Sequence, residues 1–399
     1  MSTPDVPKVA HPKDLVVSRL PPLALIPVAE GRWFADFGKA AFGTLELDVE
    51  GASPQGAELS VHLGERLCAA HMIDRTPPGS VSYRHLRLAV APGRQTVRVE
   101  IPSDTLNTAP EAVHMPHELF EVLPFRYADV HCATSFVLHA VTQLAVHYPF
   151  DEDAAAFRCS DERLNRVWEL CRYSIKATSF CGVYVDGDRE RIPYEGDAYL
   201  NQLSHYGVDS EYQLARHSLE YLLVNPTWPT EWALHCVPMA WADYEYTGET
   251  VMLERYYEVL REKTLLALAR EDGLISTTTG LVTEDFLRAM RLDTMDDLVD
   301  WPPASPADGV PGERDEYDMV PINTVVNAFH CWNLDLFSRI AGVLGRDDDR
   351  RFFAERYRLV SESLHRVCFD ATRGVYVDGE GSHHASLHAN MLPAAVGLV

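Results

Sequence analysis

A short acidic stretch, residues 186–197, carries the residue types that acid–base chemistry requires. It holds five carboxylates and two arginines within twelve residues, in the order Asp-Gly-Asp-Arg-Glu-Arg-Ile-Pro-Tyr-Glu-Gly-Asp. Crowded carboxylates repel, so we expect at least one of them to have a raised pKa, while a neighbouring arginine should lower the pKa of another. Acid–base catalysis uses this separation, because one carboxyl then stays protonated near neutrality while another stays charged. A salt-bridged surface loop is the alternative, since ion-pair networks also perturb pKa values.

Proline and glycine residues predict the backbone conformation of the acidic stretch. Pro193 and Gly196 interrupt any regular element, and Gly187 adds a further flexible position. Aromatic and apolar residues flank the stretch, at 183–185 and 198–200. We therefore predict a loop between two helices.

A second group of candidate residues lies in residues 225–232, which read Asn-Pro-Thr-Trp-Pro-Thr-Glu-Trp and which we call the tryptophan segment. Its Trp228, Glu231 and Trp232 suit a sugar ring, which has apolar C–H faces and hydroxyl edges. The alternative is an apolar entry to a helix that Glu231 caps. Asp300-Trp301 is a similar pair of an acid and an aromatic residue, in a Pro-rich connection.

Histidines near residue 385 raise the question of a metal. His384 and His388 have the i, i+4 spacing that can place two ligands on one helix face, and His383 and Asn390 lie nearby. No HExxH motif accompanies them. We therefore expect a structural or pocket-rim role, and no metal or organic cofactor.

The overall composition favours a soluble protein that acts on neutral substrates. The net charge is −24, from 35 basic and 59 acidic residues, which disfavours nucleic acid and anionic membranes as partners. The N-terminus lacks the basic start and apolar core of a signal peptide, and no apolar run of about 18 residues suggests a membrane span. Eight cysteines occur singly and without a CxxC pair, as is typical of reduced thiols in a cytoplasmic protein.

The pattern of apolar residues predicts two kinds of structure in sequence. A chain of 399 residues favours two domains. Alternating apolar and polar residues indicate the strands of an antiparallel β-sandwich, and apolar residues at helical spacing follow, starting with a helix that Ser160 can cap. We expect an N-terminal arm at 1–20, the sandwich at 21–152 and a helical domain at 153–399. The expected strands include 43–50, 59–63, 84–90 and 96–100, and the later helices lie roughly at 197–207, 209–224, 231–247, 250–271, 320–344, 348–368 and 384–398.

The acidic stretch resembles the signature loop of the α-L-rhamnosidases, glycoside hydrolases with an (α/α)6 six-hairpin catalytic domain. The family pattern runs Asp-Cys-Pro-x-Arg-Glu-Lys/Arg, an apolar residue, then Gly-Trp-x-Gly-Asp. The family's leading Asp is matched by Asp186 if one residue is deleted, and Pro193 and Tyr194 replace the first Gly and the Trp. Residues 36–43, 64–65 and 124–127 resemble the accessory sandwich of these enzymes. The residues of the acidic stretch in register are Arg189, Glu190, Arg191, Ile192, Gly196 and Asp197.

The resemblance implies hydrolysis of terminal α-L-rhamnosyl residues with inversion at the anomeric carbon. Glu190 matches the family's general acid and would protonate the leaving oxygen. Asp186, Arg189 and Asp197 would hold rhamnose hydroxyls and tune the acid. The resemblance also implies a pocket on the helical domain, to which we assign Trp228, Glu231, Trp232, Asp300 and Trp301. The alternatives are another six-hairpin enzyme, such as a glucuronyl hydrolase, and a non-catalytic sugar-binding protein.

The last residues, 393–399, form an apolar run without a polar tail. The resemblance places the family's general base on a later connection, so we nominate no base from the residues present. We expect the helical toroid to be incomplete, with about eight helices where the family has twelve. We expect the 399 residues alone to be poorly soluble and inactive. The aglycone and the oligomeric state stay open.

Overall fold

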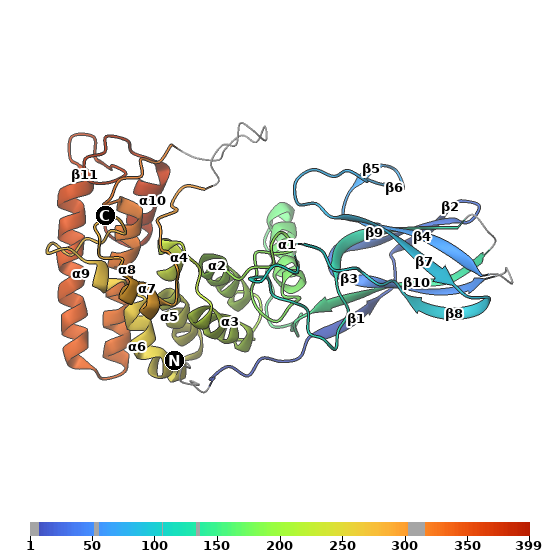
Figure 1. Cartoon of the computed structure of the whole chain (residues 1–399), viewed down its shortest axis with the longest axis horizontal. Helices are drawn as coiled ribbons and strands as arrows, with labels where there is room; N and C mark the ends of the chain where they lie inside the picture. Colours follow the sequence, from blue (N-terminus) through green and yellow to red (C-terminus); the bar gives the residue numbers. More distant parts are fainter. Residues whose placement is uncertain (1–7, 52–55, 106, 133–135, 302–315) are drawn as a thin grey trace. The chain divides into compact units, whose positions relative to one another are not determined.

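The computed structural model describes residues 8–51, 56–105, 107–132, 136–301 and 316–399. Their contacts divide the chain into two compact units, whose elements are labelled in Figure 1. Within the described ranges, we call residues 12–193 and 204–214 the sheet unit, and residues 8–11, 194–203 and 215–399 the helical unit. An antiparallel sheet followed by helical hairpins confirms the predicted fold class.

Antiparallel strands are the main regular elements of the sheet unit. The main sheet has the order β1-β10-β3-β9-β4-β7, with β2 and β8 also paired to β3. The four predicted strands overlap β3, β4, β7 and β8. The predicted N-terminal arm at 1–20 is wrong for residues 16–20, which form a strand that pairs with β10. The strands are β1 (Val16–Leu20), β2 (Ala24–Ala29), β3 (Arg32–Gly51), β4 (Ala57–Gly64), β5 (Leu67–Ala69), β6 (Met72–Ile73), β7 (Tyr83–Val90), β8 (Gly93–Arg98), β9 (Leu123–His131) and β10 (Phe136–His147).

Strand β3 organises this unit because it is long enough to pair with four other strands. Its alternating residues Leu45, Leu47 and Val49 are fully buried, as the period of two predicts for one face of a strand. They pack with apolar residues of β4 and β9 in one core. The register between β3 and β9 shifts between Asp36 and Ala41, where the strand changes partners.

Gly43 of β3 pairs with Ala145 of β10, and the two backbones lie close together there. A methyl group at Gly43 would overlap the carbonyl oxygen of Leu144, well inside van der Waals contact. We expect Gly43→Ala to lower the free energy of unfolding by about 1–3 kcal/mol, because strands in a paired sheet cannot separate locally without losing hydrogen bonds. Urea unfolding measures this. Thr96→Ala on β8 is the control and should change stability by less than about 0.5 kcal/mol. Equal urea midpoints for Gly43→Ala and Thr96→Ala would contradict the close approach of the two backbones at Gly43.

Helix α1 (Glu162–Thr178) belongs to the sheet unit. It contacts β3 and β10, and the Tyr173 hydroxyl donates to the carbonyl of Ala40 at 2.6 Å. The prediction that Ser160 caps this helix is wrong. Asp161 is the N-cap, and its Oδ1 accepts from the backbone N–H of Arg163 at 2.8 Å. A carboxylate also interacts favourably with the positive end of the helix.

The helical unit contains the remaining long helices. Helices α8 and α9 pack against each other, and α8 also contacts α4, α5 and α10. Because α8 has partners on several sides, most of its residues are buried. Helices α2 and α3 each continue into residues 204–214 of the sheet unit. The elements are α2 (Glu195–Tyr206), α3 (Gln213–Val224), α4 (Thr230–Ala233), α5 (Cys236–Thr247), α6 (Val251–Glu262), η1 (Leu266–Leu268), α7 (Glu284–Met290), α8 (Thr324–Val343), α9 (Asp347–Cys368), β11 (Phe369–Asp370), β12 (Val375–Tyr376) and α10 (Leu387–Ala395).

Several predicted helices differ in their bounds. The predicted helix 231–247 is two helices, α4 and α5. The predicted helix 250–271 ends at Glu262, since Leu265 has a positive φ of 58° and the chain turns into η1. Helix α7 was not predicted, because its seven residues are too few for a clear helical period. None of the helices in the described ranges is long and apolar enough to cross a membrane.

Candidate functional site

The acidic stretch forms the predicted loop between α1 and α2, with its last three residues in the first turn of α2. Asp186 closes this loop on itself. Its Oδ1 accepts from the backbone N–H of Ile192 at 3.3 Å, and its Oδ2 accepts from Nε of Arg189 at 3.1 Å. The Asp186 side chain is 4% exposed, whereas that of Arg189 is 58% exposed. Arg189 is therefore held by a buried acid while much of its surface remains accessible.

Arg191 fixes the same loop to the sheet unit. Its side chain is 1% exposed, and its guanidinium donates to Glu121 Oε1 at 2.7 Å, Asp188 Oδ1 at 2.9 Å and the carbonyl of Val122 at 3.1 Å. The guanidinium also lies 5.3 Å from the centre of the Phe180 ring. Arg191 has a positive φ of 54°, which a non-glycine residue adopts only when its surroundings enforce it. These contacts give the loop a defined conformation around Glu190.

Burial is the main cause of the shifted pKa values in the acidic stretch. It raises the pKa of Asp186 and of Asp188, and the neighbouring Arg189 and Arg191 oppose these shifts without reversing them. Burial also raises the pKa of Glu195. The prediction of at least one raised pKa is confirmed, but desolvation contributes more to it than repulsion between carboxylates.

Glu190 lies between the two anchored arginines. Its side chain is 39% exposed, and its Oε1 lies 3.8 Å from Nε of Arg189. A carboxyl in this position is accessible to a substrate while its neighbours are fixed. A carboxyl within direct reach of a substrate oxygen can exchange a proton with it.

A cavity of about 670 Å³ opens beside this loop in the sheet unit. Asp186 and Arg189 line it together with Phe42, Leu170 and Tyr173. Its exposed wall is mostly apolar. Its size and lining are those of a small-molecule site.

In the helical unit, the start of α2 is joined to the tryptophan segment. Glu195 is fully buried, and its carboxylate accepts from the backbone N–H of Thr227 at 3.1 Å and from the Thr227 hydroxyl. At Gly196, a methyl group would touch the ring of Trp232 at 3.4 Å. Asp197 follows, half-buried in the first turn of α2. The fold thus brings the first turn of α2 against the tryptophan segment.

The tryptophan segment is in turn joined to residues 296–301, which we call the Trp301 segment. The backbone N–H of Thr230 donates to the carbonyl of Asp296 at 3.0 Å. Glu231 is 2% exposed, and its carboxylate accepts from the backbone N–H groups of Leu298 and Val299. Burial, and then the negative charge of Asp297, raise the pKa of Glu231 to about 7.

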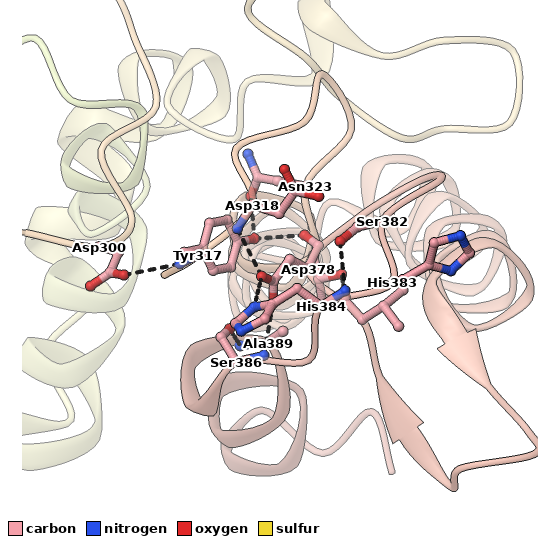
Figure 2. Close-up of polar contacts among 12 residues, drawn as sticks. Asp300, Tyr317, Asp318, Asn323, Asp378, Ser382, His383, His384, Ser386 and Ala389 are labelled. Atoms are coloured by element: carbon pink, nitrogen blue, oxygen red, sulfur yellow. Dashed lines mark hydrogen bonds and ion pairs between the residues drawn. The ribbon is translucent and has the colours of Figure 1, made fainter. Parts of the chain in front are cut away.

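Asp300 and Trp301 differ in exposure although they are adjacent. Asp300 is 3% exposed, and its Oδ2 accepts from the backbone N–H of Tyr317 at 3.2 Å (Figure 2). Trp301 is 59% exposed, and Trp228 is 43% exposed. The Pro-rich connection that follows Trp301 lies outside the described residues. The two tryptophans are therefore accessible, whereas the carboxylate of Asp300 accepts a hydrogen bond from the backbone.

Among the histidines near α10, His384 is bonded to the buried Asp378, which lies at the centre of a hydrogen-bond network (Figure 2). His384 Nδ1 lies 2.6 Å from Asp378 Oδ2, and the fully buried Asp378 also accepts from the backbone N–H groups of Asp318 and Ser386. Burial acts to raise the pKa of Asp378, but these hydrogen bonds outweigh it and hold the pKa below its usual value. Ser386 caps α10 through a bond from the Ala389 N–H. These contacts give His384 a structural partner.

The predicted site residues fall into two groups. Asp186, Arg189 and Glu190 lie together in the sheet unit. The others belong to the helical unit, and their convergence with Glu190 on one pocket stays a prediction. The sequence patterns did not indicate Glu121 or Asp297. No local spacing marks the contact between Glu121 and Arg191, 70 positions apart, or a half-buried acid in a loop such as Asp297. The second group is Asp197, Trp228, Glu231, Trp232, Asp300 and Trp301.

Comparison with known proteins places this architecture among glycosidases. Residues 152–399 match a family model described as the bacterial α-L-rhamnosidase six-hairpin glycosidase domain. A rhamnosidase from Klebsiella oxytoca with rhamnose bound has a TM-score of 0.69 at 15% identity, over 97% of this chain and 77% of that chain. A GH78 family rhamnosidase of Bacillus sp. GL1 has a TM-score of 0.65 at 18% identity, over 94% of this chain and 36% of that chain. At these identities the likeness shows the fold.

A third solved structure gives the same result. Streptomyces avermitilis α-L-rhamnosidase complexed with L-rhamnose has a TM-score of 0.67 at 16% identity, over 97% of this chain and 34% of that chain. The chain thus spans about a third of the length of two of these relatives. No curated protein sequence matches it.

Proposed function

Because the chain belongs to the family of bacterial α-L-rhamnosidase six-hairpin glycosidases, we propose that the protein hydrolyses terminal α-L-rhamnosyl residues with inversion at the anomeric carbon. The observation that carries this proposal is the loop around Glu190. It presents one accessible carboxyl between two anchored arginines. An accessible carboxyl on a fixed loop is suited to protonate a glycosidic oxygen.

The other residues of the loop would bind the sugar. Asp186 and Arg189 form a pair of acceptor and donor groups at the cavity beside the loop, and such groups recognise hydroxyls. Asp197, at the start of α2, would contribute a further acceptor. Inversion also needs a base about 6.5–9.5 Å from the acid, so that water fits between base and sugar. The proposal assigns the acid and the sugar-binding residues only.

Aromatic side chains would form the apolar part of the site. Trp228 and Trp301 are exposed, and Trp232 is half-buried against Gly196. Their rings suit the C–H faces of rhamnose. The mostly apolar cavity beside Asp186 would receive the aglycone.

A panel of glycosides tests the proposal. The protein should release 4-nitrophenol from the α-L-rhamnoside with a higher kcat/KM than from the corresponding glucuronide, glucoside and galactoside. It should also hydrolyse aryl rhamnosides with a lower KM than methyl rhamnoside if the apolar cavity holds the aglycone. Preference for the glucuronide would indicate another six-hairpin activity. Binding of rhamnose without turnover would indicate a non-catalytic sugar-binding protein.

A further inference from the structure

We propose that Glu231 is a positioning residue, whose carboxylate holds the Trp301 segment in the conformation that presents Trp301 to the substrate. This inference rests on the proposed function, in which Trp301 shapes the sugar pocket. It also changes the role expected for Glu231, which the sequence pattern assigns to the sugar itself.

The Glu231 carboxylate contacts backbone N–H groups of the Trp301 segment. Oε1 accepts from the backbone N–H of Leu298 at 3.1 Å and of Val299 at 2.8 Å, and Oε2 lies 3.2 Å from the Leu298 nitrogen. With 2% of the residue exposed, little surface is left for a ligand. Two consecutive backbone N–H groups that converge on one carboxylate fix the direction of the chain between them.

These hydrogen bonds hold an unusual backbone conformation at Val299. Val299 has a positive φ of 43°, a region that β-branched residues rarely adopt because of steric repulsion. Such a conformation persists only where surrounding contacts enforce it. The Glu231 carboxylate binds Val299 and its neighbour Leu298 directly, so it supplies this constraint at the turn before Trp301.

The Trp301 segment is also held on both sides of this turn. Before it, Thr230 N–H donates to the Asp296 carbonyl at 3.0 Å, next to Glu231 in sequence. After it, Asp300 N–H donates to the Leu298 carbonyl at 2.6 Å, and Asp300 Oδ2 accepts from Tyr317 N–H (Figure 2). Buried acids therefore hold the turn, and the exposed Trp301 follows it directly.

A neutral side chain of the same shape can replace most of this function. The Oε1 atom of Glu231 alone reaches both N–H groups, and a glutamine carbonyl oxygen can accept both bonds. The pKa of about 7 means that the neutral form of Glu231 is well populated near neutral pH. If Glu231 instead bound or protonated the sugar through its acidic group, the enzyme would not tolerate the replacement of Glu231 by glutamine.

Hydrogen exchange gives a test that does not depend on activity. In Glu231→Ala, the amides of Leu298 and Val299 should exchange about tenfold faster or more, because each loses its hydrogen bond to the side chain. Glu231→Gln should restore most of the protection. Glu355→Ala, at an exposed position of α9, is the control and should leave these amides unchanged. Unchanged exchange in Glu231→Ala would overturn the proposal.

A double-mutant cycle then connects the position of Trp301 to turnover. Glu231→Ala should raise the KM for a rhamnoside about tenfold or more, since a small displacement of a binding group has effects of this size. Glu231→Gln should lie closer to the wild type. In a Trp301→Ala background, Glu231→Ala should have little further effect. Two outcomes would assign Glu231 a role of its own and overturn the proposal. One is an equal rise in KM for Glu231→Gln and Glu231→Ala. The other is a full effect of Glu231→Ala in the Trp301→Ala background.

The two experiments separate this inference from the proposed function. If the Leu298 and Val299 amides exchange faster in Glu231→Ala but no rhamnoside is hydrolysed, the proposed function fails while the positioning of the Trp301 segment stands. If rhamnosides are hydrolysed but the exchange is unchanged, the positioning role fails alone.

Discussion

Glu190→Gln should lower kcat for a rhamnoside with a poor leaving group, such as methyl α-L-rhamnoside, by about 10²–10⁴-fold. The amide cannot donate an acidic proton, so an alkoxide would have to leave without protonation. A rhamnoside with an activated phenol needs little protonation, and its hydrolysis should be largely spared. Steady-state kinetics on the two substrates measure the difference. The prediction follows from the accessible position of Glu190 on a fixed loop.

Glu111→Gln provides a matched control, because Glu111 is an exposed carboxylate of the same unit and is not part of the acidic stretch. Its kinetics on both substrates should equal those of the wild type. If Glu190→Gln behaves like this control, Glu190 is not the general acid. A uniform loss on both substrates would instead indicate a role in binding.

Arg191→Ala should lower the free energy of unfolding by about 3 kcal/mol or more. Removing one partner of a buried ion pair leaves uncompensated charge, which typically costs about 3–5 kcal/mol. Here the loss would leave both Glu121 and Asp188 without their guanidinium, and would remove the bond to the Val122 carbonyl. Because Arg191 is 1% exposed, water cannot replace these contacts without opening the loop.

Urea unfolding of the protein measures this effect. Arg87→Ala is the matched control, since Arg87 pairs with Glu58 on the surface of the same unit, with 72% and 63% of the two side chains exposed. Exposed ion pairs contribute about 0–1 kcal/mol. If Arg191→Ala costs no more than Arg87→Ala, the guanidinium does not fix the loop.

Local patterns predicted most of the elements that carry the site. The alternation of Leu45, Leu47 and Val49 indicated a strand with one buried face, and all three are buried. Pro193 and the charged residues around it indicated a loop between two helices, and the loop is there. Such patterns succeed because side-chain direction follows the backbone period within a few residues.

Contacts between distant residues could not be predicted in this way. Nothing near Arg191 indicates Glu121 as its partner, and nothing near Glu231 indicates the N–H groups of Leu298 and Val299. The sequence shows Glu231 between two tryptophans, which favours a sugar contact, but the fold directs its carboxylate into the protein. Whether an acidic side chain is buried or exposed depends on tertiary packing, and this decides its role.

The stereochemistry of hydrolysis tests the central claim most directly. Proton NMR can follow the anomer of rhamnose that the protein releases from an aryl α-L-rhamnoside in the first minutes. An inverting rhamnosidase should release β-L-rhamnose first, and the α anomer should appear only through mutarotation. Initial release of the α anomer would contradict the inverting mechanism. Folded protein that releases no rhamnose at all would contradict the proposed function.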